Sequence, residues 1–107
     1  MGAAGSPYAA FQRAIKTRNV TLALAEARDM PTLNLADALE LVVLIAEKRP
    51  DLYERAALRW LARYFGERTV TTLAEAQLVV AALAALPGRH GGDAYPLLAA
   101  AARRPRH

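Results

Sequence analysis

Apolar residues recur at helical spacing along almost the whole chain. Side chains three and four positions apart lie on one face of a helix, so this spacing predicts amphipathic helices. No stretch alternates between apolar and polar residues for long enough to predict a strand. The sequence therefore predicts an all-α fold.

Six helices are delimited by capping and breaking residues. Side chains of Ser, Thr, Asn and Asp can accept a hydrogen bond from the first turn of a helix, and Pro and Gly are common where helices begin or end. The expected N-caps are Ser6, Asn19, Asn34, Thr72 and Asp93, whereas Pro50 opens the fourth helix, Gly66 ends it and Pro87-Gly88 ends the fifth. The predicted helices span residues 7–18, 20–29, 35–48, 51–65, 73–86 and 94–103.

Residues 35–53 and 73–95 resemble each other. Each begins with Leu-Ala-acid-Ala, continues with Leu-Val-Val and reaches Asp-x-Tyr, at a period of about 40 residues that is typical of two-helix repeats such as HEAT. Independent hairpins of similar composition are the alternative. We expect about six short helices in three antiparallel hairpins, as a short HEAT-like stack or an irregular bundle. The single domain spans 1–107, with 1–6 and 104–107 as flexible ends.

The run from Phe11-Gln12-Arg13-Ala14-Ile15 through Leu83-Ala84-Ala85-Leu86-Pro87-Gly88 resembles small all-helical proteins of GC-rich bacteria, with HEAT-like helical hairpins. The resemblance covers most of the chain. It includes no catalytic motif, and therefore implies a fold and a bacterial source but no activity.

Composition narrows the class of protein further. Hydrophobic residues make up 54% of the 107 residues and charged residues 22%, which excludes disorder as the main state. There is no Cys, so disulfide and thiolate chemistry are excluded. The longest uncharged stretch, 76–88, is shorter than the roughly 20 residues of a spanning helix, and residues 1–10 lack the pattern of a signal peptide. We expect a cytoplasmic protein with no membrane span.

Residues that support catalysis or metal binding are scarce. The pairs Asp37–Glu40 and Glu40–Glu47 share a helix face, but no nucleophile or His accompanies them. His90 has only Asp93 nearby, which is too few ligands for a metal. The surrounding loop, 87–93, lacks the Lys and Ser or Thr of a P-loop. The sequence therefore predicts a non-enzymatic protein without cofactor or metal.

The fourth helix is clearly amphipathic. Trp60 lies in the middle of an aromatic stripe and is predicted to anchor the core. Arg55, Arg59 and Arg63 follow one another at four-residue spacing on another face, and Asp51 is placed to pair with Arg55. This arginine face is either solvated or a contact for phosphate or an acidic partner.

The fifth helix is apolar nearly all round, with no charge from Ala76 onward. Such a helix is either buried on several sides or carries a contact surface. The predicted inner side holds Leu73, Ala76, Val80 and Leu83. The predicted partner interface is the opposite flank, formed by Val79, Ala82 and Leu86.

The net charge of +4 belongs mainly to the two ends of the chain, since the residues between them carry slightly more acids than bases. We expect a protein-interaction module whose partner is another protein or a second copy. The alternative is a small nucleic-acid-binding accessory protein. Its anion contacts would be Arg59, Arg63, Arg89, Arg103, Arg104 and Arg106.

Overall fold

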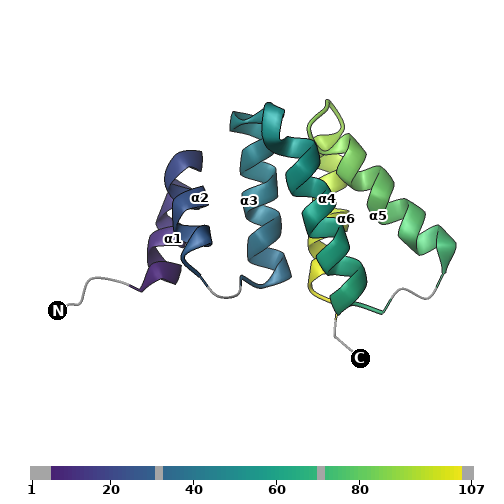
Figure 1. Cartoon of the computed structure of the whole chain (residues 1–107). Coiled ribbons are helices and arrows are strands. Elements are labelled where there is room, and N and C mark those ends of the chain that lie inside the picture. Colours follow the sequence, from purple (N-terminus) through teal and green to yellow (C-terminus); the bar gives the residue numbers. More distant parts are fainter. Residues whose placement is uncertain (1–5, 31–32, 70–71, 105–107) are drawn as a thin grey trace.

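The computed structural model describes residues 6–30, 33–69 and 72–104, which form six helices and no strand (Figure 1). The all-α prediction is confirmed. The helices are α1 (Pro7–Lys16), α2 (Val20–Arg28), α3 (Leu35–Lys48), α4 (Pro50–Glu67), α5 (Leu73–Ala85) and α6 (Gly91–Ala102).

Consecutive helices pair into three hairpins, as predicted: α1 with α2, α3 with α4, and α5 with α6. Helix α3 is central, because it also packs against α2 and α6 (Figure 1). Helix α4 packs mainly on α3, and α5 packs mainly on α6. The molecule measures 49 × 33 × 20 Å. Its shortest dimension equals about two helix diameters, so the helices form two layers and each layer has one side open to solvent.

Four predicted N-caps are confirmed by hydrogen bonds from the first helical turn. Ser6 Oγ accepts from the backbone nitrogen of Ala9 at 3.2 Å, and Asn19 Oδ1 accepts from that of Leu22 at 3.0 Å. The caps of α3 and α5 have the same arrangement. Asn34 Oδ1 accepts from Asp37 N at 2.8 Å, and Thr72 Oγ1 accepts from Glu75 N at 3.0 Å. These contacts satisfy backbone donors that a helix leaves free at its start.

Two predicted helix ends were wrong. Helix α1 stops at Lys16, because Arg18 takes the left-handed conformation (φ 59°) and turns the chain into α2. Helix α4 does not end at Gly66 but continues to Glu67. The carboxylate of Glu67 lies 2.8 Å from Arg63 Nε one turn earlier, an ion pair that favours the added residues.

The start of α6 was also wrong. The helix begins at Gly91, three residues before the predicted start, and Asp93 lies within its first turn instead of capping it. A Cβ on Gly91 would lie 2.1 Å from the carbonyl oxygen of Leu86, so only glycine fits this close approach. The connection between α5 and α6 is therefore a tight turn.

Two groups of buried side chains form the core. The larger group contains residues from α3, α4, α5 and α6, among them Leu39, Trp60, Tyr64 and Leu98. The smaller one packs Phe11 and its neighbours in α1 and α2 against α3. Trp60 is 2% exposed, so its predicted role as a core residue is confirmed.

The expected flexible ends mostly fall outside the described residues: 1–5 and 105–107 are not described. Within the described part of the chain, no helix is both long enough and apolar enough to span a membrane.

Candidate functional site

The six arginines predicted to contact an anion do not form one surface. Arg59 and Arg63 lie on α4, whereas Arg89 lies in the turn before α6 and Arg103 follows the end of that helix. The length of α6, about 18 Å for its 12 residues, separates Arg89 from Arg103. Arg104 is paired with Glu75, and Arg106 lies outside the described residues. Anion binding by these arginines stays a prediction, and of the described ones only Arg59 and Arg63 lie together on one helix.

The predicted partner interface on α5 is also wrong. Val79, Ala82 and Leu86 are 2%, 7% and 8% exposed and belong to the core. On the predicted inner side, Leu73 and Val80 are 84% and 45% exposed. Because α5 is apolar nearly all round, the sequence does not indicate which side faces the core.

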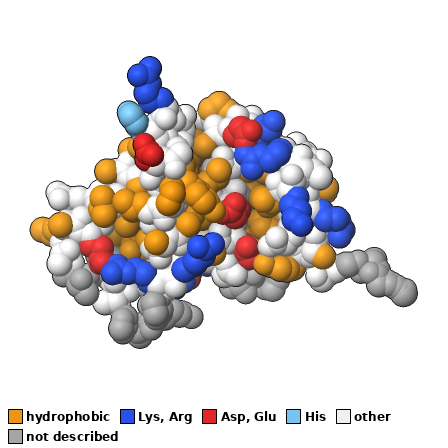
Figure 2. All heavy atoms as spheres, turned by 180° about the vertical axis from the view of Figure 1, so that it is seen from behind, with side chains coloured by type: hydrophobic (Ala, Val, Ile, Leu, Met, Phe, Trp, Pro, Cys, Tyr) orange, Lys and Arg blue, Asp and Glu red, His pale blue; other side chains and the backbone are white. Residues whose placement is uncertain are grey.

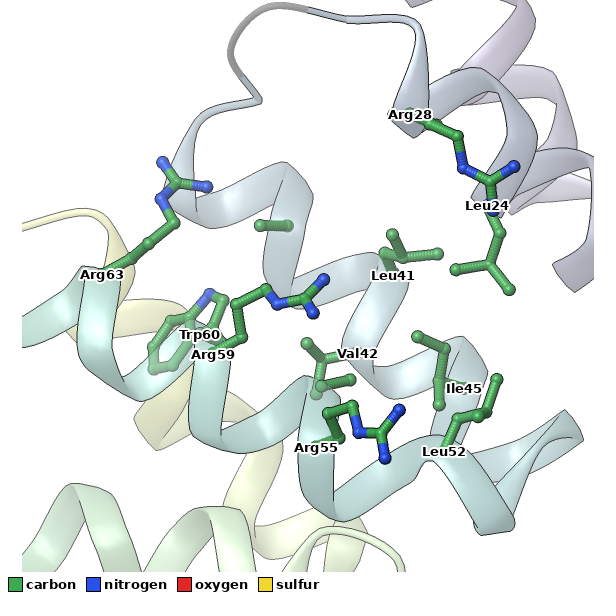
Figure 3. A pocket seen from close by; sticks show the side chains of 12 residues that line it. Leu24, Arg28, Leu41, Val42, Ile45, Leu52, Arg55, Arg59, Trp60 and Arg63 are labelled. Carbon is green, nitrogen blue, oxygen red and sulfur yellow. The ribbon is translucent and has the colours of Figure 1, made fainter.

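The α4 arginines line an open groove between α2, α3 and α4, with a volume of about 410 Å³ (Figure 3). We call it the arginine groove. Its floor is apolar and comes from all three helices. The floor residues are Leu24, Ala38, Leu41, Val42, Ile45, Leu52, Ala56 and Trp60.

Four guanidinium groups surround this apolar floor. Arg55, Arg59 and Arg63 come from successive turns of α4, and Arg28 comes from the last turn of α2. Figure 3 shows the side chains of Arg55 and Arg59 extending from α4 toward α3. No carboxylate lines the groove among the described residues, so the rim is strongly positive.

Three of these arginines have no ion pair with any acid in the described part of the chain: Arg28, Arg55 and Arg59. The expected Asp51–Arg55 pair does not form. Asp51 instead accepts two hydrogen bonds from Arg49, at 3.0 and 2.9 Å, which lower the pKa of its carboxyl group. Only Arg63 is neutralised, by Glu67. The groove therefore keeps its positive charge.

One residue of the groove floor, Trp60, is hydrogen-bonded to α3 and stacked on a neighbouring ring of α4. Its indole nitrogen donates to the carbonyl oxygen of Leu35 at 3.0 Å, and its ring stacks on Tyr64 with a centroid separation of 5.6 Å. The indole donor of this buried side chain is thus satisfied. The groove is open in the structure of the chain alone.

The carboxylates considered for catalysis each contact a different neighbour. Asp37 accepts from Gln12 on α1 at 3.3 Å, Glu40 accepts from the Tyr95 hydroxyl of α6, and Glu47 pairs with Arg18. The contact with Glu40 raises the pKa of Tyr95. These acids link α3 to neighbouring segments instead of converging on one point.

The Nδ1 atom of His90 lies 4.0 Å from Oδ2 of Asp93. In the described residues, no three His, Cys, Asp or Glu side chains gather closely enough to hold a metal ion.

Comparison with protein-family models, curated proteins and solved structures gave no match to the chain. The resemblance to small bacterial helical proteins stays a prediction.

The sequence pattern identified part of this site and missed the rest. It singled out Arg59 and Arg63, which belong to an evenly spaced row of arginines on α4. It did not indicate that Arg28 belongs to the same rim, because Arg28 lies on another hairpin. Leu24 and Arg28 are four residues apart and so lie on one face of α2, with Leu24 in the groove floor and Arg28 in the rim. That this face borders the groove follows only from the packing of α2 beside α3.

Proposed function

We propose that the protein is a non-enzymatic interaction module that binds an acidic, amphipathic helix of a partner protein in the arginine groove. The observation that carries the proposal is an apolar floor surrounded by arginines, three of which have no acidic partner in the described part of the chain. Such a surface is complementary to a helix with apolar residues on one side and acids beside them.

The apolar floor supplies affinity. Burying apolar surface contributes about 25 cal/mol per Å², and the groove volume of about 410 Å³ takes a few Leu- or Phe-sized side chains. Arginine stems cover apolar surface while their charged ends stay accessible to a partner. A partner with apolar side chains at helical spacing can therefore fill the floor.

The arginines supply direction and register. Arg55, Arg59 and Arg63 repeat every four residues, or about 6 Å along α4. A partner helix that lies along α4 and carries Glu or Asp with the same spacing can place one carboxylate near Arg55 and one near Arg59. Arg63, in contrast, is already paired with Glu67. Arg28 faces the groove from α2, so it can receive a further acid on the other side of the partner helix. Guanidinium groups bind carboxylates bidentately, which adds specificity to the charge attraction.

Nucleic acid is the alternative occupant of the arginines. The regular arginine spacing on α4 fits phosphates as well as carboxylates. A phosphate backbone, however, would leave the apolar floor unfilled. We therefore favour the acidic helix, and binding of DNA is an outcome that the experiment below can detect.

The test is a titration with a synthetic helical peptide of about five turns that carries Leu on one face and Glu at every fourth position beside it. The control peptide has the same composition in scrambled order. Trp60 is the only Trp and lies in the groove floor, so its emission reports occupancy directly. We expect the patterned peptide to bind and the scrambled one to bind at least about tenfold more weakly.

Two charge-reversal variants locate the binding site. Arg59→Glu should weaken binding of the patterned peptide by about tenfold or more, because a like charge replaces an attractive one. Arg13→Glu is the matched control: Arg13 is exposed on α1 and does not line the groove. Equal binding of the two peptides, or no effect of Arg59→Glu, would overturn the proposal. Duplex DNA binding that falls steeply with added salt would favour the nucleic-acid alternative.

A further inference from the structure

Helix α4 has a second exposed flank, opposite the arginine groove. Residues two positions apart lie about 200° apart on a helix, so Leu61 points away from Arg59. Leu58 and Phe65, seven residues apart, lie on the same flank as Leu61. Leu58 is 59% exposed and Phe65 is 42% exposed.

Helix α5 carries exposed apolar side chains on the other side of a groove from this flank. Leu73 and Val80, also seven residues apart, share one face and are 84% and 45% exposed. We call Leu58, Leu61, Phe65, Leu73 and Val80 the apolar patch. A groove of about 420 Å³ runs between the two helices, and Leu58, Leu61 and Val80 all line it. Of the described residues, Glu54 is the only charged one in its lining.

The patch is large for a monomer of this size. The largest exposed apolar patch on a typical monomer covers about 300–600 Å² and is often functional. Four large side chains that expose between 42% and 84% of their area reach this range. A standard protein contact takes about 800 Å² from each partner. The exposed alanines beside the patch on α5 enlarge the apolar surface toward that size.

We propose that the apolar patch binds the same patch on a second copy of the chain, so that the protein forms a two-fold symmetric dimer. A two-fold contact matches a surface with itself, so the surface needs both a hollow and a projection. The groove is the hollow. Leu73, the most exposed of the large apolar side chains, is the projection.

The distribution of charge favours a second copy over a charged partner. The patch carries little charge that would repel a second copy, because the arginines lie on the other flank of α4 and Glu54 is the one charged side chain that lines the groove among the described residues. A partner with charged groups would lose their hydration against leucine and valine without gaining an ion pair.

The one polar side chain on the exposed face of α5 fits the same contact. Gln77 lies close to the middle of the helix, and Ala74, Ala81 and Ala84 share its exposed face. A glutamine amide carries both donors and an acceptor, so two copies of Gln77 can bond to each other across a two-fold axis. The small alanines allow the two α5 helices to approach closely.

Figure 2 shows the opposite side of the molecule, where hydrophobic side chains form a band interrupted by acidic and basic groups. A second copy docked there would face these charges. The nearly uncharged patch between α4 and α5 is the better surface for self-association.

The test is sedimentation equilibrium over a range of protein concentrations. The unmodified chain should shift from monomer to twice that mass as concentration rises. Val80→Glu should stay monomeric, because each dimer would bury two new carboxylates at the contact. Leu22→Glu is the matched control. Leu22 is similarly exposed, at 43%, but it lies on α2, in a different hairpin from α4 and α5. It should associate like the unmodified chain.

Circular dichroism separates loss of association from loss of folding. If Val80→Glu lost helicity, Leu58→Glu on α4 would replace it, because Leu58 is 59% exposed. A monomer at every concentration, or an associating Val80→Glu and Leu58→Glu, would overturn the dimer. The two proposals fail separately: Val80→Glu should leave peptide binding in the arginine groove unchanged, and Arg59→Glu should leave the mass unchanged.

Discussion

Helices α4 and α5 border the same apolar groove, but α4 has three distinct faces and α5 has two. Around α4, a buried aromatic stripe with Trp60 separates an arginine flank from a flank that carries Leu58. Helix α5 has a buried side, which includes Val79, and an exposed side, which includes Val80, and both sides are mainly apolar. Two neighbouring valines of one helix thus have opposite environments.

The difference shows what orients each helix. The amphipathic pattern of α4 fixes its rotation, because any other rotation would bury arginines or expose Trp60. Rotation of α5 is fixed by contacts outside the helix. The hydroxyl of Tyr53 on α4 donates to the carbonyl oxygen of Leu83 at 2.6 Å, and the close turn at Gly91 holds α5 against α6.

The two valines provide the sharpest test of that difference. Val79→Glu places an unpaired carboxylate in the core, where Val79 is 2% exposed. The expected cost of several kcal/mol is comparable with the whole stability of a small domain, so this variant should unfold. At low protein concentration, where self-association does not add to stability, Val80→Glu should keep its helicity and melting temperature. Circular dichroism on the two variants measures both outcomes, and a folded Val79→Glu would show that α5 is rotated differently.

Truncation of the α4 stripe should have the next largest effect. Trp60→Ala removes the largest side chain of the core and is expected to cost about 3–5 kcal/mol. Urea unfolding followed by circular dichroism gives the value. Trp60→Phe keeps a ring but leaves the carbonyl of Leu35 without its indole donor, so it should cost about 1–3 kcal/mol. An unchanged urea midpoint for Trp60→Ala would contradict the burial of Trp60.

Helix starts could be predicted from the sequence better than helix ends. Asn34 marks the start of α3 and Pro50 fixes its end, so both bounds of that helix were predicted correctly. Starts carry a specific side-chain signal, since the cap accepts from the first turn. The end of α4 depends on a weaker balance, in which the Arg63–Glu67 pair outweighs the glycine between them. The start of α6 depends on a backbone contact with Leu86 that no local pattern contains.

The candidate site was predictable only where it lies on one helix. Arg59 and Arg63 follow from the spacing on α4, but Arg28 joins them through packing of α2 against α3. The sequence alone also does not indicate whether Asp51 pairs with Arg49 or with Arg55, because both are close to it in sequence. The structure shows that it pairs with Arg49. The apolar pattern of α5 predicted the helix and its cap but did not indicate which side of the helix faces the core. The predicted partner interface on α5 was therefore placed on the buried side.

Tyr53, which links the two helices, should make stability fall at alkaline pH. Burial raises the pKa of Tyr53 to about 12 from its ordinary value of 10.0. The folded state therefore disfavours the phenolate. Its contribution is fully present below pH 10 and is lost as the pH rises from 10 toward 12, a change of about 2 kcal/mol in the free energy of unfolding.

The control for this titration is Tyr53→Phe, which keeps the ring and removes the hydroxyl. The variant should be less stable at pH 8, by about 1 kcal/mol, because the bond to Leu83 is lost. Its stability should then fall less steeply above pH 10. Urea unfolding at several pH values measures both slopes, and identical slopes would mean that Tyr53 ionises freely.

The smallest expected effect is that of Leu73, which begins α5, and its reference is Leu86, the residue just after the end of that helix. Leu73 is 84% exposed and Leu86 is 8% exposed, although the sequence pattern places Leu73 inside and Leu86 outside. Leu73→Ala should change the free energy of unfolding by no more than about 0.5 kcal/mol, since it leaves no cavity and alanine is a good helix former. Leu86→Ala should cost about 2 kcal/mol or more, because it leaves a cavity in the core. Both are measured by urea unfolding at low protein concentration, where self-association does not add to stability. A larger loss for Leu73→Ala than for Leu86→Ala would reverse the orientation of α5 and, with it, the surface that the helix offers to a second copy.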